Sequence, residues 1–236
     1  MPLGKVYLIP NVLHEDAIAL NAVPAYVLAA IKDCSVFFTE NEKTARRYFK
    51  KLWKEMPIDN YQWFAMHKAE EDVKQNFVEQ LQMGANIGIV SDAGCPGIAD
   101  PGQILVNAAQ QLGAKVQPLA GPNSIILALM ASGLNGQQFQ FNGYLPVENL
   151  ERKKALRHLE EDSQKRNCTQ IFIETPYRNQ TLLNEILTVC KSATKLCIAV
   201  DITAASESIQ TKTVAQWEKA ILHLQKRPAI FLLSAY

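Results

Sequence analysis

Short apolar runs alternate with longer segments of helical periodicity along the chain. Short apolar runs are typical of buried strands, and apolar spacings of three and four residues are typical of amphipathic helices. Strands are expected at residues 6–9, 35–39, 87–90, 115–119, 139–142, 170–173, 196–200 and 229–233. Helices are expected at residues 22–31, 44–54, 71–83, 103–112, 125–131, 152–161, 180–190 and 215–224. This alternation predicts an α/β protein with largely parallel or mixed sheets.

A break in the pattern suggests a domain boundary. Gly133, Asn135 and Gly136, followed by two glutamines, interrupt the apolar periodicity before residue 139. We therefore expect two α/β domains, residues 1–134 and 135–236, with a cleft between them. One continuous sheet is the alternative that composition leaves open.

Composition excludes several classes of protein. A chain of 236 residues that is 48% hydrophobic can bury a real core, and a formal net charge of +1 gives no global attraction for polyanions. The five cysteines form no C-x-x-C pair, and their odd number argues against a disulfide framework, so a reducing cytoplasm is expected. The histidines lack metal-ligand spacing, and no segment resembles a signal peptide or membrane span. We expect a cytoplasmic protein without a metal.

The segment 91–102 is the most informative part of the chain. It reads Ser-Asp-Ala-Gly-Cys-Pro-Gly-Ile-Ala-Asp-Pro-Gly, between an expected strand and an expected helix. Loops at the carboxyl ends of strands in open α/β sheets bind ligands, and glycine lets the backbone approach them closely. A plain turn is the simpler interpretation, but plain connections are usually only about 2–6 residues long. The segment lacks both common nucleotide-binding glycine motifs.

Three further breaks follow expected strands, at residues 119–124, 143–146 and 174–178. The first opens onto a helix that Asn123 or Ser124 can cap, and free N–H groups at a helix start can also bind a ligand. Because the carboxyl ends of parallel strands meet at one edge, these loops together predict one site.

These segments resemble the tetrapyrrole methylase superfamily, and most closely the bacterial enzymes that 2'-O-methylate cytidine in small-subunit ribosomal RNA. The resemblance extends from about residue 5 to residue 187, in the order and spacing of that family. It rests on residues 91–102, 120–124, 128–134, 139–146, Arg152 and 174–178.

The resemblance implies a methyltransferase that uses S-adenosylmethionine, held in a cleft between two α/β domains. It implies cofactor contacts from Asp92, Ala93 and Gly94, from Pro10 after the first strand, and from the second domain. The complete implied set is Pro10, Asp92, Ala93, Gly94, Ser124, Ile125, Phe172, Thr175 and Pro176. The family also implies a homodimer.

The chain departs from the family in several places. The first motif, Pro-Thr-Pro-Ile-Gly-Asn-Leu in the family, is reduced to residues 10–16, and its Glu-Asp-Thr-Arg block reads Glu-Asn-Glu-Lys at 40–43. Tyr177 replaces the family histidine, and residues 201–204 replace an Arg-Glu-Leu-Thr block. The resemblance places these departures on the acceptor side, so the sequence supports cofactor binding more firmly than the identity of the methyl acceptor.

A ribose hydroxyl is a poor nucleophile and needs a general base. Glu40 and Glu174 each follow an expected strand and are the preferred candidates, with Asp92 and His67 as further ones. A helix-capping or surface-pairing carboxylate is the alternative interpretation for each. We expect Asp100 to stabilise its own loop.

The helix expected at 44–54 has a cationic face. Its lysines and arginines recur at helical spacing with no acid between Lys43 and Lys54, and a second basic cluster begins at Arg152. Such stripes can contact RNA phosphates, although a solvated face is the commoner explanation. The predicted RNA-binding residues are Arg46, Arg47, Lys50, Arg152 and Lys153.

Three functions follow from these observations. The first is methylation of ribosomal RNA, which the cationic stripe favours. The second is methylation of a tetrapyrrole or other small molecule, favoured by the near-neutral charge and the altered first motif. The third is a non-catalytic adaptor that binds the cofactor.

Overall fold

The computed structural model describes residues 2–66 and 70–235. The chain forms two compact units that meet between Asn123 and Ser124. We call them the first and the second unit and describe each by itself.

The first unit contains an entirely parallel sheet with the strand order β3-β2-β4-β1-β5. Its strands are β1 (Val6–Ile9), β2 (Val36–Thr39), β3 (Gln62–Ala65), β4 (Ile87–Val90) and β5 (Val116–Pro118). Its helices are η1 (Ala17–Ala22), α1 (Val27–Asp33), α2 (Glu42–Leu52), η2 (Ile58–Asn60), α3 (Glu70–Gln82) and α4 (Gln103–Gln111).

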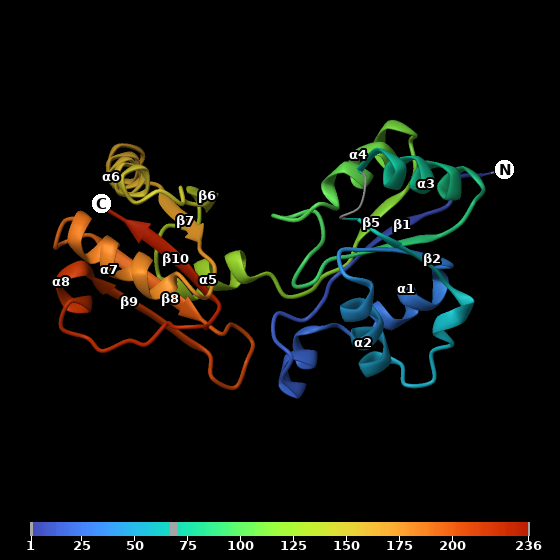
Figure 1. Ribbon diagram of the computed structural model, residues 1–236, viewed down its shortest axis with the longest axis horizontal. Helices are drawn as coiled ribbons and strands as arrows, with labels where there is room; N and C mark the ends of the chain where they lie inside the picture. The colour runs from blue at the N-terminus through green and yellow to red at the C-terminus, as the bar shows by residue number, and fades with distance from the viewer. Residues whose placement is uncertain (1, 67–69, 236) are drawn as a thin grey trace. The chain divides into compact units, whose positions relative to one another are not determined.

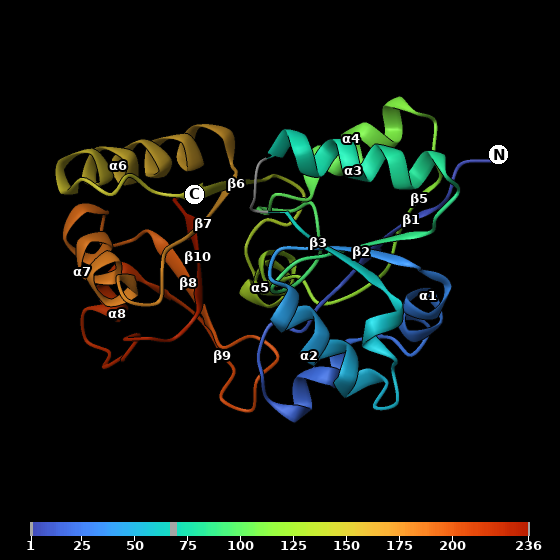
Figure 2. The same ribbon diagram turned by 45° about the vertical axis from the view of Figure 1, so that its right-hand side comes forward.

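Helices cover both faces of this sheet, as Figures 1 and 2 show. Val6, Phe38 and Ile89 pack with the apolar sides of α3 and α4, while Ile9 and Phe37 pack with those of α1 and α2. Successive side chains of a strand point to opposite faces. The continuous apolar runs therefore supply both layers of the core at once, as is typical of parallel sheets.

Gly88 shows how closely the α1–α2 layer is packed. A Cβ atom there would lie 2.6 Å from a ring carbon of Phe37 and 2.7 Å from a methyl carbon of Ile9. Both neighbours are fully buried. The glycine in the middle of β4 is therefore required by the packing of its neighbours.

The second unit contains a mixed sheet with the order β6-β7-β10-β8-β9. β6 and β7 are parallel, and the remaining pairs are antiparallel. The strands are β6 (Phe139–Tyr144), β7 (Thr169–Ile173), β8 (Lys195–Val200), β9 (Ser208–Thr213) and β10 (Ala229–Ser234). The helices are α5 (Ser124–Ser132), α6 (Asn149–Arg166), α7 (Asn179–Val189) and α8 (Val214–Trp217). The predicted α/β class, with parallel and mixed sheets, is confirmed.

The boundary between the units lies earlier than the sequence predicted. Helix α5 contacts β8, β9 and β10, and the hydroxyl of Thr211 donates to the carbonyl of Ser132 at 2.6 Å. Because α5 packs on the second sheet, it belongs to the second unit, and the units divide between Asn123 and Ser124, whereas the sequence predicted a division after residue 134.

Candidate functional site

The order of strands in the first sheet locates a crevice. After β1 the chain continues to α1, on one face of the sheet, whereas after the neighbouring strand β4 it continues to α4, on the other face. The loops that leave the neighbouring strands β1 and β4 therefore diverge. Ligands of open α/β sheets bind where loops diverge in this way.

Asn11 joins these two loops. Its backbone forms an antiparallel bridge with Gly94, with N–O distances of 2.8 and 3.2 Å. Its side-chain amide donates to the carbonyls of Ser91 and Asp92 at 3.1 and 2.9 Å, and its Oδ1 accepts from the Val12 N–H. Asn11 is 1% exposed. A buried amide with these partners fixes the start of the 91–102 loop.

Two carboxylates hold the rest of this loop. Oε2 of Glu40, just after β2, accepts the Asp92 N–H at 3.0 Å. Oδ1 of Asp100 accepts the N–H groups of Gly97 and Gly102, both at 2.8 Å. The structure thus gives Asp100 the loop-stabilising role that the sequence predicted, and it brings Glu40 to the backbone of Asp92.

Glycines allow the turns after β1, β4 and β5 to approach one another. Gly94 has φ of 73°, and a Cβ there would lie 3.2 Å from Leu13. A Cβ on Gly121 would lie 2.1 Å from the Cβ of Pro10. The Pro10 carbonyl accepts the hydroxyl of Tyr48 at 2.8 Å. Pro10, Glu40 and the Asp92–Gly94 segment, which lie far apart in the sequence, therefore converge.

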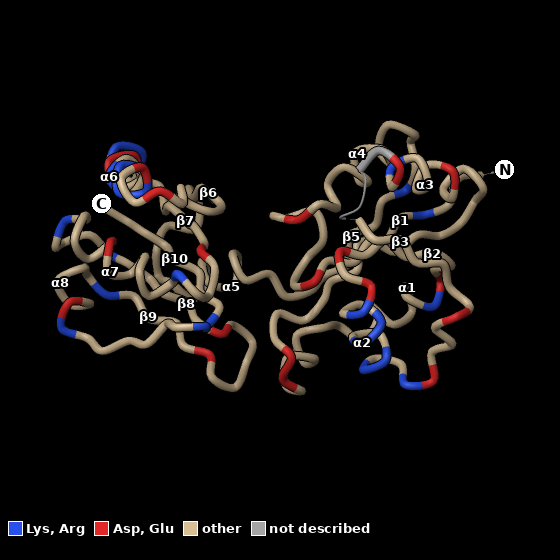
Figure 3. Tube along the Cα trace, in the orientation of Figure 1, with Lys and Arg blue, Asp and Glu red and all other residues tan. Residues whose placement is uncertain are grey.

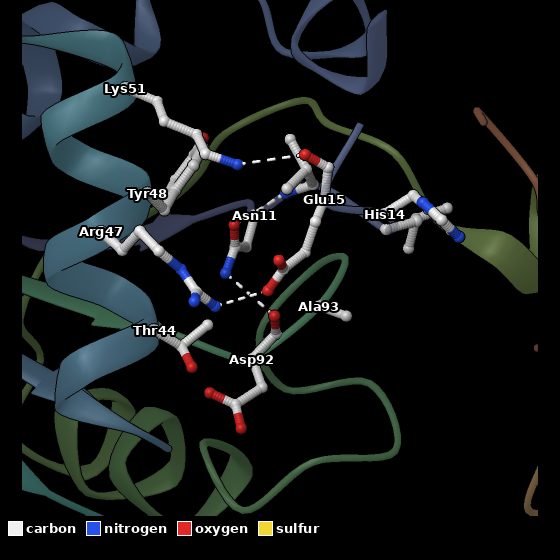
Figure 4. Close-up of a pocket in the computed structure, with 11 residues that line it drawn as sticks. Asn11, His14, Glu15, Thr44, Arg47, Tyr48, Lys51, Asp92 and Ala93 are labelled. Atoms are coloured by element: carbon white, nitrogen blue, oxygen red, sulfur yellow. Dashed lines mark hydrogen bonds and ion pairs between the residues drawn. The ribbon is translucent and has the colours of Figure 1, made fainter. Parts of the chain in front are cut away.

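Two hollows are lined in part by this loop. One, of about 90 Å³, is lined by the segment after β1, by α2 and by Asp92 and Ala93 (Figure 4). The other, of about 390 Å³, is lined mainly by apolar groups: Leu8, Cys95, Pro96, Gly97, Ile98, Gln103, Val106, Pro118 and Leu119. Pockets for small molecules usually measure about 300–1,000 Å³, so the second hollow has the size for part of such a ligand.

The remaining predicted cofactor residues belong to the second unit. Ser124 and Ile125 begin α5, and both are partly exposed. Thr175 and Pro176 are partly exposed in the turn after β7, where the Pro176 carbonyl accepts the Lys226 N–H at 3.0 Å.

Phe172 is placed differently from that turn. It is fully buried in the core of the second unit, where its ring stacks on Phe231 with the centroids 5.8 Å apart. The resemblance implied that Phe172 and the Thr175–Pro176 turn supply an apolar wall of the cofactor site, and in the structure the Phe172 ring packs inside the second unit. The Thr175–Pro176 turn remains as the predicted contact.

Glu174 is held differently from Glu40. Its side chain is 1% exposed, and Oε1 accepts both an Arg178 N–H and the Thr175 N–H, each at 2.6 Å. This geometry fixes the turn after β7. The predicted base His67 lies outside the described residues.

A model of the tetrapyrrole (corrin/porphyrin) methylases matches residues 20–218. The chain belongs to this family. The match covers most of both units, and it includes the loop held by Asn11 and the start of α5.

Two curated relatives have the same name. The chain is 33% identical over 241 aligned residues to the ribosomal RNA small subunit methyltransferase I of Escherichia coli O157:H7, covering 99% of the chain and 78% of that protein. It is 41% identical over 154 residues to the Vibrio cholerae protein of that name, covering 65% of the chain and 52% of the relative. The chain thus spans about half the length of the Vibrio relative.

Solved structures share the fold of the family. The methyltransferase CobJ superimposes with a TM-score of 0.63 over 99% of the chain and 94% of its own, at 16% identity. A cobalt precorrin-4 methyltransferase superimposes with a TM-score of 0.59 at 14% identity, covering 98% and 94%. At these identities the likeness concerns the fold.

Sequence reasoning missed two hydrogen-bonded features, one at the 91–102 loop and one in the second unit. One is Asn11, which lies in the altered first motif of the family. The other is a network after β8, where the Asp201 carboxylate accepts from Ser206 at 2.8 Å and pairs with Arg227 at 2.7 Å. Asp201 and Thr203 have φ values of 51° and 72°. Only Asn11 left a sequence signal, as a polar residue directly after a buried strand.

Arg46, Arg47 and Lys50 of α2 have partners within the protein. Figure 3 shows their clustering along the helix. Arg46 pairs with Glu42 and lies over the Trp63 ring, and Lys50 donates to two backbone carbonyls. Arg47 pairs with Glu15. The expected stripe exists, but these charges are partly compensated.

Arg152, which the sequence predicted to contact RNA, is buried in the structure. It is 6% exposed, and its guanidinium donates to both carboxylate oxygens of Glu185 and to the carbonyls of Pro146 and Val147. The hydrogen bonds that Arg152 donates to Glu185 lower the pKa of this carboxyl below its usual range. Because its donors face inward, Arg152 is a structural residue. Its neighbour Lys153 is partly exposed.

The thiol of Cys95 is poorly suited to be a nucleophile. Burial, together with the charge of Asp100, raises its pKa. Burial also raises the pKa of Cys190, to about 12. Thiols with raised pKa values carry little thiolate at neutral pH.

Proposed function

We propose that this chain transfers a methyl group from S-adenosylmethionine to a ribose 2'-hydroxyl of small-subunit ribosomal RNA. The observation that carries the proposal is the 91–102 loop, which Asn11, Glu40 and Asp100 hold at the divergence of the loops after β1 and β4. The names of the relatives support RNA as the acceptor.

The residues present fit this cofactor. S-adenosylmethionine carries a positive sulfonium and an adenine ring with apolar faces, and it supplies an electrophilic methyl group. Asp92 and Ala93 are exposed on the loop, and the 390 Å³ hollow beside Cys95 is mainly apolar. We assign cofactor binding to Pro10, Asp92, Ala93 and Gly94 in the first unit. In the second unit, Ser124, Ile125, Thr175 and Pro176 complete the proposed set.

The protein's main task in such a displacement is to align the two reactants. Proximity and orientation can contribute roughly 7–11 kcal/mol to a well-aligned reaction. The loop is fixed by buried or charged partners at its beginning and near its end, so little ordering is needed when ligands bind. We assign its rigidity to this positioning role.

Glu40 is the preferred general base of the two predicted carboxylates. It is partly exposed and reaches the loop backbone, whereas the Glu174 side chain is buried and paired with Arg178. We expect Glu40→Gln to lower the methylation rate by about 10²–10⁴-fold, the usual contribution of general-base catalysis. Cofactor affinity, measured by calorimetry, should change little. A normal rate in this variant would exclude Glu40 as the base.

Transfer of a labelled methyl group tests the function directly. Protein and labelled S-adenosylmethionine are incubated with small ribosomal subunits that lack the modification, and in parallel with a small-molecule extract. Label in a ribose of the RNA supports the proposal. Label only in the extract would support a small-molecule methyltransferase, and cofactor binding without transfer would support the non-catalytic adaptor.

The small-molecule alternative has one observation in its favour. Arg46, Arg47 and Lys50 all have partners within the protein, so the cationic stripe attracts RNA less strongly than its sequence suggests. The names of the relatives outweigh this observation.

Homodimer formation and action in the cytoplasm, where ribosomes are modified, belong to the same proposal. Sedimentation of the purified protein over a range of concentrations tests the dimer. A monomer at all concentrations would contradict it. None of the helices in the described part of the chain combines the length with the apolar character that a membrane span requires.

A further inference from the structure

Glu15 lines the smaller hollow together with two cations of α2, Arg47 and Lys51. Its carboxylate accepts from Nη2 of Arg47 at 2.5 Å, and its backbone carbonyl accepts from Nζ of Lys51 at 3.2 Å (Figure 4). Glu15 follows β1, whereas both cations lie on α2, one helical turn apart. One acidic residue of a distant segment thus contacts two neighbouring cations.

The ion pair is exposed and therefore weak. The Glu15 side chain is 74% exposed and that of Arg47 is 51% exposed. Exposed pairs of this kind typically contribute about 0.2–1 kcal/mol. A backbone phosphate has one negative charge and two non-bridging oxygens, as a carboxylate has, and it forms the same charge-assisted bidentate hydrogen bonds with a guanidinium, so it can replace a weakly held carboxylate.

Arg47 differs in this respect from the other two predicted cations of α2. Arg46 is held both by Glu42 of its own helix and by the Trp63 ring, and Lys50 is bound to the carbonyls of Lys54 and Met56. Releasing either would break contacts within its immediate surroundings. Releasing Arg47 requires only that Glu15 move.

The position of the hollow connects this pair with the proposed site. Asp92 and Ala93 form its opposite wall, and Asn11 ties that wall to the segment that carries Glu15. In Figure 4 the Asp92 carboxylate points away from the Arg47–Glu15 pair. An anion bound to α2 would therefore lie beside the proposed cofactor loop without facing that carboxylate.

We propose that Arg47 and Lys51 bind a backbone phosphate of the RNA acceptor strand, and that Glu15 occupies this position in the free protein as an intramolecular competitor. This inference rests on the proposed function, because it names a contact to its acceptor. Removal of the Glu15 carboxylate should therefore strengthen RNA binding.

Binding of a labelled short single-stranded RNA to the full chain, followed at several salt concentrations, tests the competitor. Glu15→Gln should raise the affinity about two- to fivefold at low salt, the range expected for an exposed ion pair. Glu79→Gln is the matched control, since it makes the same charge change at an exposed residue of α3, on the other face of the first sheet. Equal effects of the two variants would overturn the proposal.

A second pair of variants tests the phosphate contact. Arg47→Gln should lower the affinity and reduce the slope of log affinity against log salt by about 0.7, the value for one phosphate of a single strand. Lys115→Gln removes an exposed cation just before β5, at the opposite edge of the sheet, and should leave the slope unchanged. Identical slopes in both variants would contradict the proposal.

Two further outcomes separate this inference from the proposed function. If the unaltered protein binds no RNA, the proposed function and the phosphate contact both fail. If Arg47→Gln weakens the binding of S-adenosylmethionine in calorimetry but leaves RNA binding intact, Arg47 binds the carboxylate of the cofactor. The phosphate assignment is then wrong, while the proposed function stands.

Discussion

Asn11 is a single side chain that connects two loops of the proposed site. Both hydrogens of its amide group are directed at carbonyls, those of Ser91 and Asp92, and its Oδ1 accepts the Val12 N–H. In an aspartate of the same shape, an oxygen would face the two carbonyl oxygens. The loop position therefore depends on the amide itself.

Asn11→Asp should destabilise the first unit by about 1–3 kcal/mol, the cost of leaving buried polar groups without partners. It should also weaken the binding of S-adenosylmethionine, since the Asp92–Gly94 segment would shift. Denaturant unfolding and calorimetry measure the two effects. Asn76→Asp is the matched control, because Asn76 also donates to a backbone carbonyl, that of Asp72, but at an exposed position. Equal effects of both variants would show that Asn11 does not position the loop.

The Arg152–Glu185 pair contributes to the stability of the second unit. The two side chains are 7% and 8% exposed, so removing one partner leaves a buried charge. Arg152→Ala should cost about 3–5 kcal/mol. Because the pKa of Glu185 is lowered in the folded state, its contribution is complete above the usual glutamate pKa of about 4.3 and is lost as the pH falls through the lowered value.

Hydrogen exchange of α6 and α7 between pH 7 and pH 3 measures this loss. Protection in the unaltered chain should decline as Glu185 becomes protonated, whereas Glu185→Gln should be less protected at pH 7 and less dependent on pH. Glu151→Gln is the control, since it removes an exposed partner of Lys154 on the same helix. The same pH dependence in Glu185→Gln as in the unaltered chain would exclude this carboxylate as the source.

At the scale of elements, the turns after β1 and β5 are in close contact. A Cβ on Gly121 would meet Pro10 at 2.1 Å, so Gly121→Ala requires the backbone to move. Overpacking of this kind typically costs about 1–3 kcal/mol. We expect weaker cofactor binding in calorimetry. Gly136→Ala should have no such effect, because a Cβ there has no neighbour within 4 Å. Unchanged cofactor binding in Gly121→Ala would show that the contact between Gly121 and Pro10 does not support the cofactor site.

The elements differ in how well the sequence predicts them. Strands such as β1 and β4 lie at the expected residues, because a run that is buried on both faces is apolar throughout. β3 and β9 were missed: both lie at sheet edges, and Ser208–Thr213 is mostly polar. The helix expected at 215–224 is only Val214–Trp217, held by a Thr213–Gln216 capping box. Local periodicity carries no information on edge pairing.

Sequence reasoning about the proposed site shows a similar division. The loop 91–102 was recognisable because its glycines, prolines and acids interrupt two regular elements. The partners of the charged residues were not recognisable, because Arg47 meets Glu15 and Arg152 meets Glu185 only after folding. A cationic stripe in a sequence therefore gives the number of charges, but not how many of them remain available for a ligand.

At the scale of the whole molecule, the division into two units assigns α5 to the second sheet. Alternate residues of β10, such as Phe231 and Leu233, pack toward α6 and α7. By the alternation of a strand, Ile230 and Leu232 point to the other face, and both are buried. α5 contacts β10, and Figure 2 shows it on the opposite side of that sheet from α6 and α7. Covering this face is thus the structural role of α5.

A fragment of residues 124–236 should therefore unfold cooperatively in denaturant, whereas residues 135–236 should be less stable and expose apolar surface. In the full chain, Leu129→Ala should destabilise the second unit by about 2–5 kcal/mol, since Leu129 is buried on α5. Met130→Ala is the matched control, because Met130 on the same helix is 74% exposed. Equal stability of the two fragments, together with equal effects of the two substitutions, would show that the second unit begins after residue 134. The opposite result would mean that the helix following the β5 turn folds with the second sheet. Gly121 and Ser124, only three positions apart, would then be held in place by different hydrophobic cores.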